Sequence, residues 1–258
     1  MSAVTLDSLA VGSAVTLNIS GAATEFIITH QGLPSDDYDD SCNGTWLLMK
    51  NVFEKRIVDS DSNDYANSEV NTYLNGTFLE LFDSNIKSVI KQATLPCKVV
   101  TDASNSTTID SNVSAKIFIP SATEVGMTFN TGYTEGSIWS YFSTHISVSY
   151  RIAYLNGTAT AWWTRTPDTS WANRNWYVNT SGGGSSNAVS ATFIGVRPAL
   201  ILPSTIWADE SNNIITTPPY NTYAGVAGSV RAVTDYAGVA GAVRSVTTYK
   251  GVGGAVRS

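Results

Sequence analysis

The fold is decided by a series of strand signals late in the main domain: Trp162-Trp163-Thr164-Arg165, Trp176-Tyr177-Val178, Ala191-Thr192-Phe193-Ile194-Gly195 and Arg197-Pro198-Ala199-Leu200-Ile201-Leu202. Aromatic and β-branched residues are frequent in these segments, and loop-forming residues separate them. Successive side chains of a strand point to opposite faces, so we expect at least one ring of Trp162 and Trp163 in the core. The region after Ala161 is therefore predicted to consist of strands and loops.

Further strand signals lie upstream. Residues 14–20 and 24–30 are β-rich runs separated by Gly21, which predicts an opening hairpin. A polar loop then leads into residues 45–49, an apolar run that predicts a buried strand. Residues 116–120 predict another strand.

Helical spacing of apolar residues occurs between these strands. Residues 66–82 carry such a pattern, with Asn67 or Ser68 able to cap its start. Shorter helices are expected over residues 84–92, over residues 137–143, and from Ser121, whose Glu124 three residues later completes a capping box. The mixture of helices and strands predicts an α+β domain.

Six ordered motifs carry a resemblance to a known family: Asn63-Asp-Tyr-Ala-Asn-Ser68, Tyr73-Leu-Asn75, Phe118-Ile-Pro-Ser-Ala-Thr-Glu-Val125, Arg151-Ile-Ala-Tyr154, Trp162-Trp-Thr-Arg-Thr-Pro167 and Gly195-Val-Arg-Pro-Ala-Leu200. Together they resemble an uncharacterised domain family common in phages and prophages of gut Gram-positive bacteria, over nearly all of residues 1–208. That family is similar to the C-type-lectin-like fold of formylglycine-generating enzymes and of the variable proteins of diversity-generating retroelements. The resemblance implies a C-type-lectin-like main domain.

A repeat occupies the C-terminus. Three copies of a 13-residue unit start at Tyr223, Tyr236 and Tyr249, and each reads Tyr-x-Gly-Val-x-Gly-x-Val-Arg. Paired small residues at the centre of each unit suit a tight hairpin turn, because glycine adopts positive φ freely. We therefore expect a domain over residues 1–208, a linker over 209–222 and a β-hairpin repeat module over 223–258. The alternative is a flexible low-complexity tail.

The predicted hairpin of the first unit sets Gly225 opposite Val230 and Tyr223 opposite Ala232. Its apolar faces are narrow, and an isolated hairpin is marginally stable in water. We therefore expect the repeats to pack against other copies of the chain, as a trimer or larger assembly around a threefold or helical axis. The residues expected to make these contacts are Tyr223, Val226, Val230, Tyr236, Val239, Val243, Tyr249, Val252 and Val256.

The composition argues against two classes of partner. The 258 residues carry a net charge of −6, and no Lys or Arg precedes Lys50, so nucleic-acid binding is not expected. No apolar run approaches the roughly 18 residues of a membrane span, and the first 49 residues hold six carboxylates and no base. Membrane insertion and a secretory signal peptide are therefore not expected either.

A binding site is predicted around the tryptophan-rich segment 168–177. Aromatic faces stack on sugar rings, while Asn and Arg bond to hydroxyl groups, so this segment suits a glycan or protein receptor. We expect Trp171 to be exposed, whereas the alternative places these rings in the core. The candidate ligand-binding residues are Trp171, Arg174, Asn175, Trp176 and Tyr177.

Residues for catalysis or metal binding are few. His30 and His145 are 115 positions apart. Cys42 and Cys97 are expected to be separate thiols, with one disulfide between them as the alternative, and they lack the placement of the paired cysteines of formylglycine-generating oxidases. Two acidic clusters, residues 36–40 and 59–64, fit either a Ca²⁺ loop or helix caps. The second begins like an EF-hand loop and then departs from that pattern. We expect no catalytic residues, no metal and no cofactor.

These features lead to one expected function and two alternatives. The repeats are similar to tails of phage virion proteins, so the chain is expected to be a non-enzymatic virion protein, a tail or head fibre or appendage that binds the host cell surface. Its partners would be other virion proteins and a host glycan or protein. The first alternative is a capsid-decoration or assembly module without receptor binding, and the second, an enzyme, has the least support.

Overall fold

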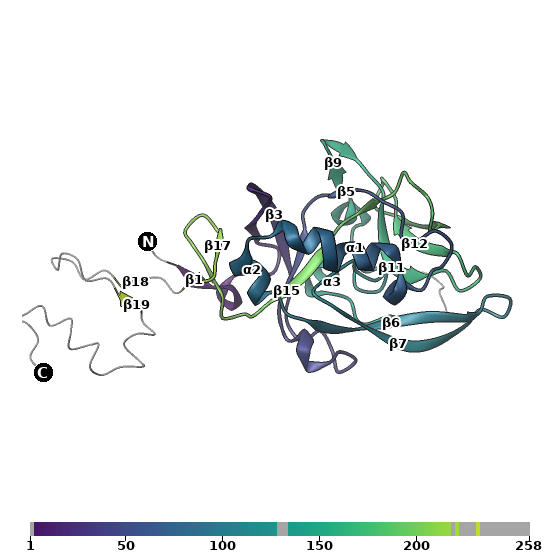
Figure 1. Ribbon diagram of the computed structural model, residues 1–258, viewed down its shortest axis with the longest axis horizontal. Coiled ribbons are helices and arrows are strands. Elements are labelled where there is room, and N and C mark those ends of the chain that lie inside the picture. Colours follow the sequence, from purple (N-terminus) through teal and green to yellow (C-terminus); the bar gives the residue numbers. More distant parts are fainter. Residues whose placement is uncertain (1–2, 128–133, 218–219, 222–230, 233–258) are drawn as a thin grey trace, which may run out of the picture.

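The computed structural model describes residues 3–127, 134–217, 220–221 and 231–232 (Figure 1). It is mostly β, with 38% strand and 18% helix distributed over several small sheets. The α+β, C-type-lectin-like class expected from the sequence is therefore wrong. The α-helices are α1 (Glu69–Tyr73), α2 (Ser84–Val89) and α3 (Ser140–Thr144), each only five or six residues long.

The helical pattern of residues 66–82 is realised as four short consecutive pieces. They are η3 (Tyr65–Asn67), α1, the π-helical η4 (Leu74–Phe78) and η5 (Leu79–Leu81). Of the two predicted caps, Asn67 and Ser68, it is Ser68 that caps α1: its Oγ accepts a hydrogen bond from the backbone N–H of Asn71 at 3.2 Å. At Ser121 the capping-box bonds form, but the backbone makes only a turn. A local signal for a helix start therefore does not ensure that a helix follows.

The first five-stranded sheet has the order β2-β3-β4-β15-β8, and every neighbouring pair is antiparallel. Its strands are β2 (Ala14–Ile19), β3 (Ala22–Gly32), β4 (Gly44–Met49), β15 (Ala199–Leu202) and β8 (Ile117–Phe118). The predicted opening hairpin is confirmed, with Ser20 and Gly21 at positive φ in its turn. Strand β4 is buried along its whole length, as predicted.

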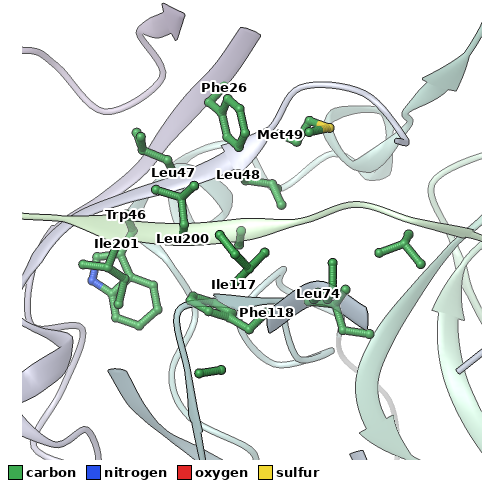
Figure 2. Packing of buried hydrophobic residues seen from close by; sticks show 14 of the residues in the cluster. Phe26, Trp46, Leu47, Leu48, Met49, Leu74, Ile117, Phe118, Leu200 and Ile201 are labelled. Carbon is green, nitrogen blue, oxygen red and sulfur yellow. The ribbon is translucent and has the colours of Figure 1, made fainter. Parts of the chain in front are cut away.

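The core gathers on this sheet (Figure 2). Trp46 of β4 is fully buried, and its ring lies 5.8 Å from Phe118 and 5.4 Å from Trp139, measured between centroids. Its indole nitrogen donates to the Gly32 carbonyl oxygen at 3.0 Å, so the polar end of the ring is satisfied inside the core.

The second five-stranded sheet has the order β13-β12-β11-β14-β5. Its strands are β13 (Gly184–Ala188), β12 (Arg174–Val178), β11 (Trp162–Pro167), β14 (Gly195–Val196) and β5 (Glu54–Lys55). Trp162 and Trp163 are both fully buried, which confirms the core prediction. The strand expected over residues 191–195 is mostly loop, and only Gly195 of that segment is in β14.

Arg197 links the two sheets where β14 leads into β15. Its guanidinium donates to the carbonyl oxygens of Met49 and Lys50, at 2.8 and 3.0 Å, and lies over the Trp162 ring. Gly195 is required next to it, because a Cβ at that position would lie 2.3 Å from Val52 Cγ1. The Gly-Val-Arg-Pro segment therefore joins the sheets by close backbone approach.

A long hairpin of β6 (Ala93–Asp102) and β7 (Thr107–Ala115) runs along the lower side of the molecule in Figure 1. Smaller pairs are β9 (Tyr154–Leu155) with β10 (Thr158–Ala159), and β1 (Val4–Thr5) with β16 (Trp207–Ala208) and β17 (Ile214–Ile215). Short 3-10 turns are η1 (Leu6–Ser8), η2 (Asp40–Cys42) and η6 (Val148–Arg151). Because β17 pairs with β16, the first part of the expected linker 209–222 belongs to a sheet of the main domain.

Two short strands are described beyond that sheet, β18 (Tyr220–Asn221) and β19 (Arg231–Ala232). They pair antiparallel, with Tyr220 opposite Ala232, so the predicted pairing of Tyr223 with Ala232 is wrong by three positions. The residues expected to mediate association lie outside the described residues: Tyr223, Val226, Val230, Tyr236, Val239, Val243, Tyr249, Val252 and Val256.

Candidate functional site

The loop between β11 and β12 presents the most exposed tryptophan of the described residues. Trp171 is 54% exposed, which agrees with the prediction from the sequence. The loop closes on itself, because the Trp171 N–H donates to the Asp168 carbonyl oxygen at 3.1 Å and the Asp168 N–H donates to the Arg174 carbonyl oxygen at 2.8 Å. The indole is thus displayed on a closed turn.

The Asn63 side chain holds this loop in place through hydrogen bonds to its backbone. Its side chain is almost fully buried, and Nδ2 donates to the carbonyl oxygens of Trp171 at 2.7 Å and Arg174 at 3.1 Å. Its backbone N–H also donates to the Ala172 carbonyl oxygen at 3.0 Å. One asparagine therefore satisfies several loop carbonyls, so little conformational entropy remains to be lost when a ligand binds.

Arg174 lies beside the exposed ring. Its Cζ is 5.1 Å from the Trp171 ring centroid, in cation–π geometry. Among the described residues no carboxylate forms an ion pair with this guanidinium, so its N–H groups remain free to donate. The tip of the β6–β7 hairpin adds hydroxyl groups nearby, since Ser106 Oγ lies 3.4 Å from Ser170 Oγ.

The other three predicted ligand-binding residues do not share the surface of Trp171 and Arg174. Asn175 is fully buried, and its Nδ2 donates to the Thr164 carbonyl oxygen at 3.3 Å. Trp176 and Tyr177 are partly buried and pack against the core. Of the five candidates, the structure brings only Trp171 and Arg174 together on the surface.

The acidic cluster at residues 59–64 caps local backbone. Asp59 accepts backbone hydrogen bonds from Asp61, Ser62 and Glu69. Burial opposes the charged form, but these N–H groups outweigh it and lower the pKa of Asp59. Asp64 caps η3 by accepting from the Ala66 N–H. Over the described part of the chain, no group of three or more His, Cys or carboxylate side chains is arranged to hold a metal.

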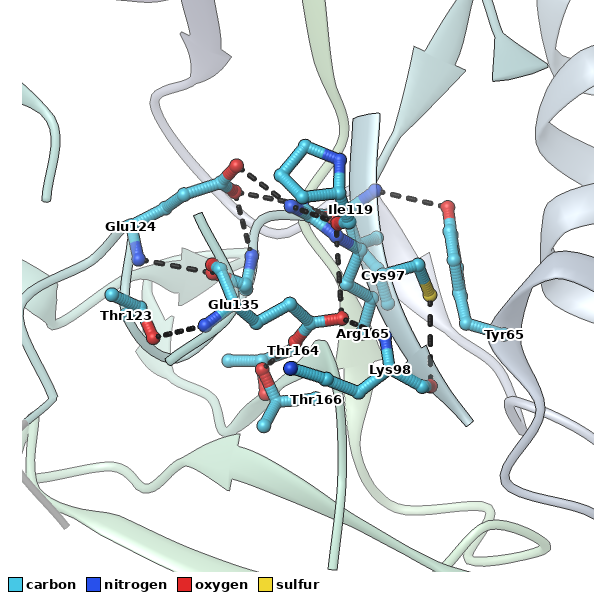
Figure 3. Close-up of polar contacts among 12 residues, drawn as sticks. Tyr65, Cys97, Lys98, Ile119, Thr123, Glu124, Glu135, Thr164, Arg165 and Thr166 are labelled. Atoms are coloured by element: carbon cyan, nitrogen blue, oxygen red, sulfur yellow. Dashed lines mark hydrogen bonds and ion pairs between the residues drawn. The ribbon is translucent and has the colours of Figure 1, made fainter. Parts of the chain in front are cut away.

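A buried ionic network is centred on Arg165 of β11 (Figure 3). Arg165 donates to Glu124 through two hydrogen bonds of 2.7 Å, and its Nε lies 3.7 Å from an oxygen of Glu135. Tyr38 donates to Glu124 at 2.8 Å, and the Thr166 hydroxyl donates to Glu135. All three ionic side chains are 0% exposed. Because the charged side chains are buried and bonded to one another, the network holds these segments of the chain together.

Burial and charge pairing both shift pKa values in this network. Burial raises the pKa of Glu135, although Arg165 and the Thr166 hydroxyl act against the shift. Burial lowers the pKa of Arg165, but the adjacent Glu124 outweighs it and the net shift is upward. Sequence reasoning assigned Glu124 to a capping box and did not find its ion pair.

The two cysteines are not bonded to each other, and the two histidines have different neighbours. Cys42 and Cys97 are buried free thiols, as predicted, and burial raises the pKa of Cys42 to about 11. His30 Nδ1 lies 2.8 Å from Ser140 Oγ, and burial lowers its pKa. His145 stacks on Tyr141 with 4.5 Å between centroids. None of these groups lies at the Trp171 loop.

Comparison with known proteins gave one match. A family model described as a domain of unknown function (DUF6273) matches residues 43–204, a span that contains the Trp171 loop, Asn63 and the three charged residues of the ionic network, Glu124, Glu135 and Arg165. No curated protein and no solved structure matches the chain. No helix among the described residues is long and apolar enough to cross a membrane.

Proposed function

The chain belongs to the family described as a domain of unknown function (DUF6273), and we propose that it acts as a binding module that contacts a host-surface glycan through Trp171 and Arg174. The observation that carries this proposal is an exposed indole on an immobilised loop, next to an arginine with free donors. A sugar ring would stack on the indole through its C–H face, and its hydroxyl groups would accept hydrogen bonds from the guanidinium.

We further propose that the module belongs to a phage virion, as a fibre or appendage protein associated with other copies of itself and with other virion proteins. Support comes from the six ordered motifs of the main domain and from the Tyr-x-Gly-Val repeats. A binding module on a fibre gains affinity from multiple copies, so weak contact by one exposed tryptophan suffices when several chains engage the same cell.

Binding of the purified full-length protein to host cells and to their isolated envelope glycans tests this proposal. Trp171→Ala should weaken binding at least tenfold, or about 1.4 kcal/mol, because it removes the stacking surface. Ile146→Ala is the matched control, since Ile146 is an 83% exposed apolar residue of a different loop. It should bind like the unmodified chain.

Arg174→Lys separates charge from shape. Lysine keeps the charge and loses the planar donors, so we expect binding between that of the unmodified chain and that of Trp171→Ala. Undiminished binding by folded Trp171→Ala would remove this site from the proposal. No binding to any envelope fraction would favour the capsid-decoration alternative.

A further inference from the structure

A surface hollow of about 350 Å³ lies at the opposite end of β12 from the Trp171 loop. Its apolar lining consists of the rings of Phe193 and Tyr177 and the small side chains of Ala159 and Ala161. The polar lining includes Lys55 and Asn179, together with threonine hydroxyls. None of the described residues that line the hollow is a carboxylate.

The two rings are held by buried neighbours. Phe193 is 54% exposed, but the next residue, Ile194, is fully buried, and its carbonyl oxygen accepts from the Arg56 N–H at 3.1 Å. The Tyr177 ring meets the buried Trp163 ring edge-on, with 5.9 Å between centroids. An exposed phenylalanine displayed on a fixed backbone, beside a second fixed ring, is a preformed stacking surface.

The polar lining is oriented in the same way. Asn179 Oδ1 accepts hydrogen bonds from the Ser181 N–H, the Ser181 hydroxyl and the Gly183 N–H, at 2.9, 2.7 and 3.1 Å. These bonds fix the carboxamide, and its Nδ2 donor has no acceptor among the described residues. The Thr160 hydroxyl donates to the Thr158 carbonyl oxygen at 2.9 Å, so its own oxygen remains able to accept.

Lys55 gives the hollow its charge. It is exposed and has no ion-pair partner among the described residues, because the adjacent Glu54 is bonded to Arg56 at 2.8 Å. An unpaired ammonium at the edge of a stacking surface favours a ligand that joins an apolar ring face to a negative group.

We propose that this hollow binds a sugar that carries an anionic substituent, independently of the Trp171 site. The ring face packs on Phe193 and Tyr177, ring hydroxyls bond to Asn179 and Thr160, and the anion pairs with Lys55. A carboxylate and a phosphate both satisfy Lys55, so acidic sugars and sugar phosphates share the required chemistry.

Titration of the ¹⁵N-labelled full chain with glucose, glucuronate and glucose 6-phosphate tests this site by NMR. Shifts should include residues 55, 158–161, 177–180 and 193. At these residues the anionic probes should bind about threefold to fivefold tighter than glucose, as expected for one exposed ion pair. Tighter binding of one anionic probe than of the other would assign the substituent to carboxylate or phosphate.

Two variants and one control complete the test. Phe193→Ala should abolish binding of all three probes. Lys55→Met should reduce the affinity for both anions to that for glucose and leave glucose binding unchanged. Ile146→Ala, at an exposed residue outside the lining of the hollow, should bind all three probes like the unmodified chain. The inference is overturned if no probe shifts these residues, or if Lys55→Met retains the preference for anions.

Discussion

Replacing Arg165 with methionine should destabilise the protein by about 3–5 kcal/mol, the cost of removing one partner of a buried ion pair. The variant keeps a side chain of similar length but leaves the fully buried Glu124 without its two 2.7 Å hydrogen bonds. It also deprives the carbonyl oxygens of Pro96 and Ile119 of their donor. Each buried acceptor left without a donor costs about 1–3 kcal/mol on its own, so the total loss of stability should be at least about 3–5 kcal/mol.

Urea unfolding followed by tryptophan fluorescence measures this cost. Arg56→Met is the matched control, because the Arg56–Glu54 pair is about one-third exposed and should contribute about 1 kcal/mol or less. If Arg165→Met is too unstable to measure, Glu124→Gln tests the same network with a smaller expected loss of unfolding free energy, because it removes the charge and keeps the shape of the side chain. A folded Arg165→Met variant that loses no more than the control would refute the assignment of a structural ion pair.

Three further outcomes are expected. Because burial raises the pKa of Glu135, the contribution of this carboxyl to stability is present below its ordinary pKa of 4.5 and is lost as the pH rises through the pKa of the folded state. Glu135→Gln should therefore gain stability relative to the unmodified chain as the pH increases. Parallel pH profiles of the unfolding free energy for the two proteins would contradict this. Gly195→Ala should cost about 1–3 kcal/mol by forcing β14 away from Val52, whereas Gly76→Ala, with open space around its Cβ, should not, and equal melting temperatures would contradict the close approach. Neither Cys42 nor Cys97 should react with a thiol reagent at pH 8 until urea unfolds the chain, because both thiols are buried and their pKa values are raised. Fast labelling of the folded protein would show instead that one of the thiols is accessible.

The strands that were predicted from the sequence are those with a strong local pattern. The opening hairpin, the apolar run of β4 and the Trp162-Trp163 pair all combine β-branched or aromatic residues with turn signals, and the structure confirms each. The β6–β7 hairpin was missed because it is rich in Ser, Thr, Asn and Asp and contains Pro96, residues that local rules assign to loops. Much of β7 faces solvent, so its sequence carries little hydrophobic alternation.

The helices were overpredicted for a related reason. The apolar spacing over residues 66–82 correctly predicts that one side of this segment faces the core, because Val70, Leu74 and Phe78 are fully buried. The same spacing is satisfied by α-helical, π-helical and 3-10 turns in succession, and periodicity alone does not distinguish these from one long helix. The fold class depended on that distinction, which is why α+β was expected and a mostly β chain was found.

The candidate site shows which part of a binding surface the sequence can reveal. Trp171 and Arg174 are close in sequence, and their residue types alone suggested stacking and hydrogen bonding. The residue that immobilises them is Asn63, 108 positions away, and it was grouped with neighbouring acids as a candidate Ca²⁺ loop. The acids around it, Asp59 and Asp64, cap their own turn, whereas Asn63 is the cluster member with N–H donors in its side chain. Loop carbonyls require donors, so an amide within an acidic cluster that is otherwise occupied with caps is the signal that would have marked Asn63 as a long-range anchor.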